Sequence, residues 1–167
     1  SSFENDGSPS EGFFCSKKFS KDYTKATLFT RSDMSGASEL ISSFNKAGLL
    51  VKSYDSSNTS VSSNDYTYNE KGNIISIISH IRSSDDDFVN EILEEHLYEY
   101  NDKGQPAQMI RIKNRADSTI ILFAADENNN VTIEKDTRSG TKYYYYYDSK
   151  KRLTDIVQEN DLKTNLV

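Results

Sequence analysis

Aromatic and aliphatic residues alternate with polar residues over short stretches of this chain, and clusters of turn-forming residues separate the stretches. The clearest example is YTYNEKGNIISI (66–77), where alternate aromatic residues precede Asn69, two polar residues, Gly72 and an apolar run. A period of two is typical of a strand with one covered face. Asn followed by Gly at this spacing favours a tight turn. The stretch therefore predicts a β-hairpin.

The same pattern recurs four more times, at spacings of 22 to 32 residues. In each copy a type I turn followed by a left-handed residue, the G1-bulge hairpin, would join the two strands. Three copies have glycine at the left-handed position. Asn129 tolerates that conformation, whereas Lys151 does so poorly, so we expect the fifth turn to be the most strained or the most different. The residues before the five turns are Phe44, Tyr68, Tyr100, Ala125 and Tyr147.

Further turn signals between the copies, such as NRADS and DTRSG, predict that each hairpin leads directly into the next. Residues 13–44 add three expected strands, with turns near Ser20–Asp22 and Ser32–Gly36. The sequence therefore predicts an all-β fold of about twelve strands. It would be a long antiparallel meander of repeated β-hairpins, forming a twisted or partly closed sheet.

One segment supports two interpretations. In SSDDDFVNEILEEHLYEY, Ser84 could cap a short helix, with Asp87 completing a capping box. Against this, the aromatic pattern before the third turn must already be strand, and the other copies use this interval as strand. We favour one long strand over Phe88–Tyr100.

Composition limits the size of the core and the class of partner. The chain has 167 residues, of which 35% are apolar, and its mean hydropathy is -0.73, so the core must be thin or extended. We expect a flexible tether over residues 1–12 and a single domain over 13–167. The net charge of -6 and the absence of a basic cluster argue against nucleic acid and anionic membranes as partners.

No catalytic or metal-binding signature is present in the sequence. The lone Cys15 excludes an internal disulfide, and His80 and His96 fit no compact zinc motif. If the strands around Asp85–Asp87 form a hairpin, His80 lies opposite about residue 91 rather than His96. The acidic run Asp85–Asp87 is better explained as a solvated turn than as a calcium site. We expect no enzyme activity, no metal and no cofactor.

The candidate ligand-binding residues lie in the run KYYYYYD. In a strand, Tyr143 and Tyr145 face one way, whereas Tyr144 and Tyr146 face the other. Tyr145 also belongs to a stripe of aromatic residues that recurs on one face of the copies. The stripe is either the core or a ladder of rings that stacks on sugars or on a partner protein. Exposed rings would favour binding, and fully packed rings a structural role.

The pattern aromatic–x–Tyr–Asn/Asp–x–x–Gly resembles the YD repeat of the Rhs-type family over roughly residues 40–160. The matches centre on Tyr68–Asn69–Gly72, on Tyr100–Asn101–Gly104 and on Tyr147–Asp148. Pro106, Ala125 and Lys151 depart from the family pattern. The resemblance implies stacked β-hairpins in secreted or cell-surface bacterial proteins, and small versions resemble surface or lipoprotein modules. It implies no catalytic residue in the repeat.

These observations lead to two functional hypotheses. The first is a non-catalytic binding module that engages a glycan or surface protein through Tyr-rich strands. It would lie outside the cytoplasm, as an outer-membrane lipoprotein, in the periplasm or secreted, with its signal peptide removed. The alternative is a purely structural scaffold or spacer with no small-molecule ligand. No run of about 18 apolar residues is present, so we expect no membrane-spanning helix.

Overall fold

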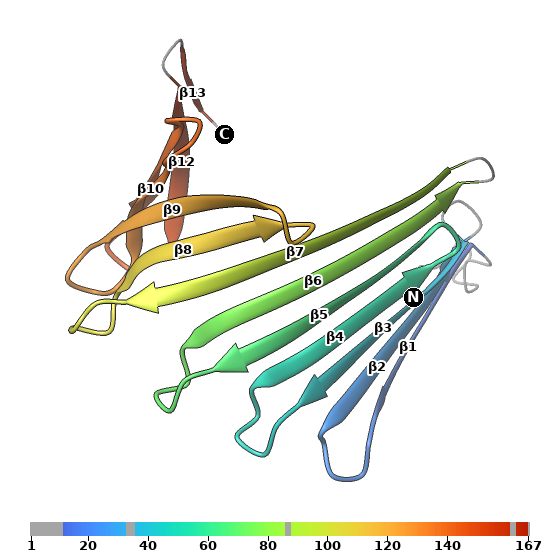
Figure 1. Cartoon of the computed structure of the whole chain (residues 1–167). Coiled ribbons are helices and arrows are strands. Elements are labelled where there is room, and N and C mark those ends of the chain that lie inside the picture. Colours follow the sequence, from blue (N-terminus) through green and yellow to red (C-terminus); the bar gives the residue numbers. More distant parts are fainter. Residues whose placement is uncertain (1–11, 33–35, 86–87, 161–162, 167) are drawn as a thin grey trace, which may run out of the picture. The chain divides into compact units, whose positions relative to one another are not determined.

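The computed structural model describes residues 12–32, 36–85, 88–160 and 163–166, which contain thirteen β-strands and no helix (Figure 1). Each strand pairs with its neighbours in the chain, in the order β1 to β13 without closure. The predicted all-β meander is therefore confirmed, as an open sheet. The strands are β1 Phe13–Phe19, β2 Lys25–Ser32, β3 Gly36–Phe44, β4 Leu50–Ser57, β5 Ser60–Tyr68, β6 Ile74–Asp85, β7 Phe88–Tyr100, β8 Pro106–Lys113, β9 Asp117–Ala125, β10 Val131–Asp136, β11 Lys142–Tyr147, β12 Leu153–Asn160 and β13 Lys163–Leu166.

The ambiguous segment is one long strand, because β7 covers Phe88–Tyr100 as the repeat pattern predicted. The estimate of about twelve strands missed the short β13. The expected tether over residues 1–12 lies outside the described residues, apart from Gly12.

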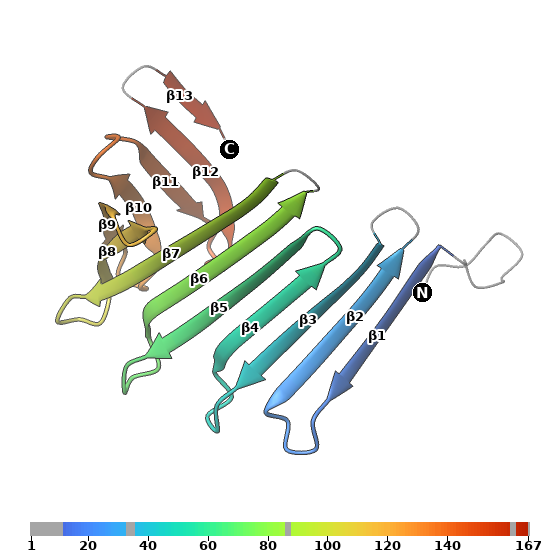
Figure 2. The ribbon, with the colours of Figure 1, turned by 45° about the vertical axis from the view of Figure 1, so that its right-hand side comes forward.

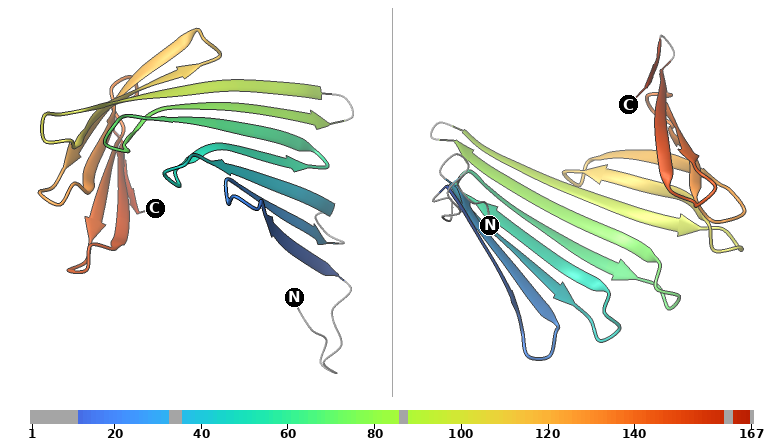
Figure 3. Two further views of the ribbon diagram at one scale, coloured as in Figure 1. Left: turned by 90° about the horizontal axis from the view of Figure 1, so that it is seen from below. Right: turned by 180° about the vertical axis from the view of Figure 1, so that it is seen from behind.

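The chain forms two compact units, residues 1–93 and 94–167. In the first unit β1–β6 lie side by side as a single layer, and in the second β10–β12 do the same (Figures 2 and 3).

All five repeat turns share one set of backbone hydrogen bonds. In the turn at Asn69, the Gly72 amide donates to the Asn69 carbonyl at 3.0 Å, and the Asn69 amide donates to the Asn73 carbonyl at 2.9 Å. The Asn69 side-chain oxygen accepts from the amides of Lys71 and Asn73 at 3.0 and 2.9 Å. The other turns begin at Asn45, Asn101, Asp126 and Asp148 and repeat these bonds.

The predicted left-handed residue follows each turn. Its φ is +81° at Gly72, +67° at Asn129 and +62° at Lys151. The strand register also shifts by one residue beside each turn, as between Thr67 and Tyr68, which confirms the bulged hairpin. The fifth turn is therefore strained at Lys151 but is not different in its hydrogen bonding.

Tyrosine hydroxyls connect successive repeat turns. The Tyr68 hydroxyl donates to the carbonyl of Leu50, the first residue of β4, at 2.6 Å. The Tyr147 hydroxyl donates in the same way to Val131, the first residue of β10, at 2.8 Å. Each acceptor lies just after the preceding repeat turn. The hydroxyls of Tyr68 and Tyr147 therefore link their own hairpins to the preceding ones in the chain.

The core is thin, as the composition predicted. Among the residues that the structure describes, the buried side chains are Met109, Thr119 and Ile121. Met109 lies opposite Ile121 across β8 and β9, and Ile121 is only 1% exposed. The most buried of the described residues therefore lie in the second unit.

Candidate functional site

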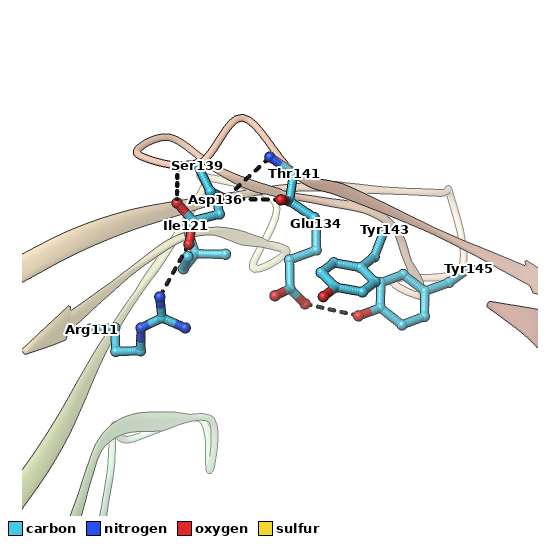
Figure 4. A pocket seen from close by; sticks show the side chains of 8 residues that line it. All are labelled: Arg111, Ile121, Glu134, Asp136, Ser139, Thr141, Tyr143 and Tyr145. Atoms are coloured by element: carbon cyan, nitrogen blue, oxygen red, sulfur yellow. Dashed lines mark hydrogen bonds and ion pairs between the residues drawn. The ribbon is translucent and has the colours of Figure 1, made fainter. Parts of the chain in front are cut away.

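A cavity of about 260 Å³ lies on one face of strands β8–β11 in the second unit (Figure 4). The strand register explains how distant residues meet there. Asp136 of β10 lies opposite Ile121 of β9, and Glu134 lies between Phe123 of β9 and Tyr143 of β11. Alternate residues of a strand share a face, so these positions line one surface. The lining includes Arg111, Ile121, Glu134, Asp136, Tyr143 and Tyr145.

Asp136 anchors one side of the cavity. Its Oδ2 accepts a hydrogen bond from Arg111 Nη2 at 3.1 Å, and its Oδ1 accepts from the amides of Arg138 and Ser139 at 2.8 and 2.9 Å. The Ser139 amide is the main cause that lowers the Asp136 pKa below its ordinary value, with the Arg138 amide and the Arg111 charge acting in the same direction. Asp136 is therefore ionised at neutral pH and holds Arg111 in place.

Tyrosine rings form the opposite side. The Tyr145 hydroxyl donates to Glu134 Oε2 at 2.8 Å. Burial, followed by this hydrogen bond, raises the pKa of Tyr145 above its ordinary value, so the phenol stays protonated. Figure 4 shows the Tyr143 and Tyr145 rings beside each other, with the Glu134 carboxylate directed at the Tyr145 hydroxyl. The site thus combines two rings, two carboxylates and one guanidinium.

The tyrosine run splits between the two faces, as its alternation predicted. Tyr143 and Tyr145 line the cavity, whereas Tyr144 and Tyr146 lie on the other face of β11. The Tyr144 hydroxyl donates to Glu159 Oε2 at 2.7 Å, and Tyr146 is 51% exposed. The structure therefore brings two of the four candidate residues together in one site.

Sequence reasoning missed the charged half of the cavity. Glu134 and Asp136 sit at alternate positions of VTIEKD, a pattern that places both carboxylates on one face of a strand. That pattern could have identified them as a pair. Arg111 had no such signal, because its place beside Asp136 depends on the register of three strands.

The remaining candidates are separate from this cavity. His80 Nε2 lies 2.5 Å from Glu91 Oε1, so these two side chains are in contact between β6 and β7. His96 Nε2 instead contacts Glu94 Oε1 at 2.6 Å. In the described part of the chain no three His, Cys, Asp or Glu side chains are placed to hold a metal ion. Asp86 and Asp87 lie outside the described residues.

No protein-family model and no curated protein matches this sequence. The described residues include no helix that is long and apolar enough to cross a membrane.

Proposed function

We propose that this protein is a non-catalytic binding module whose ligand is a glycan, held in the cavity beside Tyr143 and Tyr145. The observation that carries the proposal is the pairing of phenol rings with ionised side chains in one concave site. Ligand sites in proteins are typically concave and combine apolar or aromatic surface with a few placed polar groups.

Sugar chemistry matches this lining. A pyranose ring has an apolar face of C–H groups, which packs against aromatic rings, and a rim of hydroxyl groups. Carboxylates such as Glu134 accept hydrogen bonds from hydroxyls, and the Arg111 guanidinium donates them. Arg111 is already hydrogen-bonded to Asp136, and Tyr145 to Glu134. Little side-chain entropy is therefore lost when a ligand binds.

We further propose that the module lies outside the cytoplasm, as a bacterial surface, periplasmic or secreted protein. The resemblance of the repeat pattern to the YD repeat supports this placement. A glycan is the kind of partner that such a location would provide.

A structural scaffold without a ligand is the second candidate function. The hydrogen bonds from Tyr68 and Tyr147 to the preceding turns favour it, because they give part of the aromatic stripe a structural role. Tyr143 and Tyr145 differ from Tyr68 and Tyr147, because their rings line a cavity.

A glycan array tests the proposal. The wild-type chain should bind a defined subset of glycans, and Tyr143→Ala or Tyr145→Ala should weaken binding about tenfold through loss of ring contact. Tyr146→Ala is the matched control, because Tyr146 lies on the same strand but on the opposite face and is half exposed. It should bind like the wild type.

Two results would contradict the proposal. A wild-type chain that binds no glycan would favour the scaffold. Equal losses in the Tyr145→Ala and Tyr146→Ala variants would show that the cavity is not the binding site.

A further inference from the structure

A second cavity of about 250 Å³ adjoins the first and shares Arg111, Asp136 and Ser139 with it. It lies where the β8–β9 hairpin meets the turn between β10 and β11. No aromatic residue lines it. Its own contributions are charged or polar: Lys113, Asp117, Thr119 and Arg138.

The lining of the second cavity holds more cations than carboxylates, and the Glu94 carboxylate, which is not part of the lining, pairs with Lys113. The lining holds three cations, Arg111, Lys113 and Arg138, against two carboxylates, Asp117 and Asp136, in a chain whose net charge is -6. The Asp136 carboxylate is already satisfied in part by two backbone amides. An anion entering the cavity would therefore meet more donors than acceptors.

Lys113 is the cation with the most freedom to bind a ligand. Its Nζ forms an ion pair with Glu94 Oε2 at 3.6 Å, which is longer than a hydrogen bond, and its side chain is 51% exposed. Arg138 Nη1 instead contacts Asp117 Oδ1, and its Nη2 contacts the Ser118 carbonyl. Arg111 is held by Asp136. The two arginines are thus fixed in position, while Lys113 can turn toward a ligand.

The loop that completes the cavity is anchored to the sheet. Both the amide and the hydroxyl of Thr137 donate to the Ile120 carbonyl, at 3.0 and 2.8 Å. The Asp136 amide donates to the Thr141 carbonyl at 3.0 Å. These bonds fix residues 137–141 against β9, so the cavity is formed before any ligand arrives.

We infer that the second cavity is a subsite for the anionic group of an acidic sugar, and that the two cavities together bind an acidic oligosaccharide. This inference rests on the proposed glycan-binding function. A sugar ring packs against Tyr143 and Tyr145 in the first cavity. A carboxylate or sulfate on the same or the next sugar meets Lys113 and Arg111 in the second.

Matched pairs of glycans that differ only in charge test the inference. One pair is trigalacturonic acid and its methyl ester, and the other is 3′-sulfolactose and lactose. The pairs separate a carboxylate from a sulfate as the anionic group. Calorimetric titration of the full chain should show about tenfold tighter binding of the acidic member of at least one pair. Raising sodium chloride should weaken only that member.

In the Lys113→Ala variant, the ratio of the affinities for the acidic and the neutral member of a pair should fall to near one. The affinity for the neutral member should stay unchanged. Lys150→Ala is the control, because Lys150 lies in the repeat turn at Asp148, away from both cavities. Thermal unfolding of each variant confirms that it is folded.

The outcomes separate the two proposals. Equal binding of acidic and neutral members, or a preference that survives in Lys113→Ala, overturns the acidic subsite while glycan binding stands. Failure of the wild type to bind any member of the array overturns both.

Discussion

Lys151 occupies a backbone conformation that glycine occupies in three equivalent turns. Its φ of +62° places an L side chain in the left-handed region, which is unfavourable by about 1–2 kcal/mol. Asp148 offsets this strain: its Oδ1 accepts from the amides of Lys150 and Arg152, and its Oδ2 accepts from Arg152 Nε at 2.8 Å. The Arg152 amide is the main cause that lowers the Asp148 pKa, so the carboxylate is ionised and fully available for these bonds at neutral pH.

Lys151→Gly should therefore stabilise the protein. We expect a gain of roughly 0.5–1 kcal/mol in the free energy of unfolding, after the greater chain entropy of glycine is subtracted. Urea unfolding measures the change. Gly104→Ala is the reciprocal control. No atom lies within 4 Å of an added Cβ there, so only its φ of +77° should act, and stability should fall. A loss of stability in Lys151→Gly would contradict this account.

At the scale of elements, the protein repeats one hairpin, which includes its turn and, at Tyr68 and Tyr147, a tyrosine that bonds to the preceding hairpin. Its turn could be predicted from sequence because every determinant is local: an Asx residue, two polar residues and a left-handed position. Phe88–Tyr100 was assigned correctly because the neighbouring copies outweighed a local capping signal. The acceptors of Tyr68 and Tyr147 could not be predicted, because they lie 18 and 16 residues back and depend on the bulge beside each turn.

Removal of the connecting hydroxyl should weaken the link between neighbouring hairpins. Tyr68→Phe and Tyr147→Phe each remove one hydrogen bond to a backbone carbonyl and should lower the free energy of unfolding by about 1 kcal/mol. Tyr146→Phe, at a half-exposed position, should change stability by less than about 0.5 kcal/mol. Chemical denaturation of the three variants makes the comparison. Equal effects at all three positions would show that the hydroxyl bonds are unimportant.

At the scale of the whole molecule, the thirteen described strands pair in chain order, and the buried side chains among the described residues all lie in β8 and β9. Stability in such a linear array is the sum of local contributions. Low apolar content predicted a thin core, but its location at Met109 and Ile121 could not be read from the sequence. Other strands have equally apolar runs, and Ile78 in one of them is 40% exposed. The cavity could not be predicted from the sequence either, because Arg111, Asp136 and Tyr145 come from three different strands.

Ile121→Ala should destabilise the second unit more than any comparable change in the first. A buried Ile→Ala substitution typically removes about 2–5 kcal/mol, and Ile121 is 1% exposed. Hydrogen exchange should show faster exchange across β8–β10. Ile78→Ala, in the first unit, should have a much smaller effect. If amide protection against hydrogen exchange were also lost throughout β1–β6 in the Ile121→Ala protein, that would contradict the expectation that the change destabilises mainly the second unit.

The repeat turns also bear on how a protein of this kind changes length in evolution. Each turn carries its own determinants, and the tyrosine bonds at Tyr68 and Tyr147 reach back only to the preceding turn. In-frame duplication of the coding sequence for one 22- to 32-residue copy would therefore insert two strands whose bonds are already specified. Homologous chains with different numbers of copies are the expected product, with residues 106–147 kept intact wherever the proposed glycan site is retained.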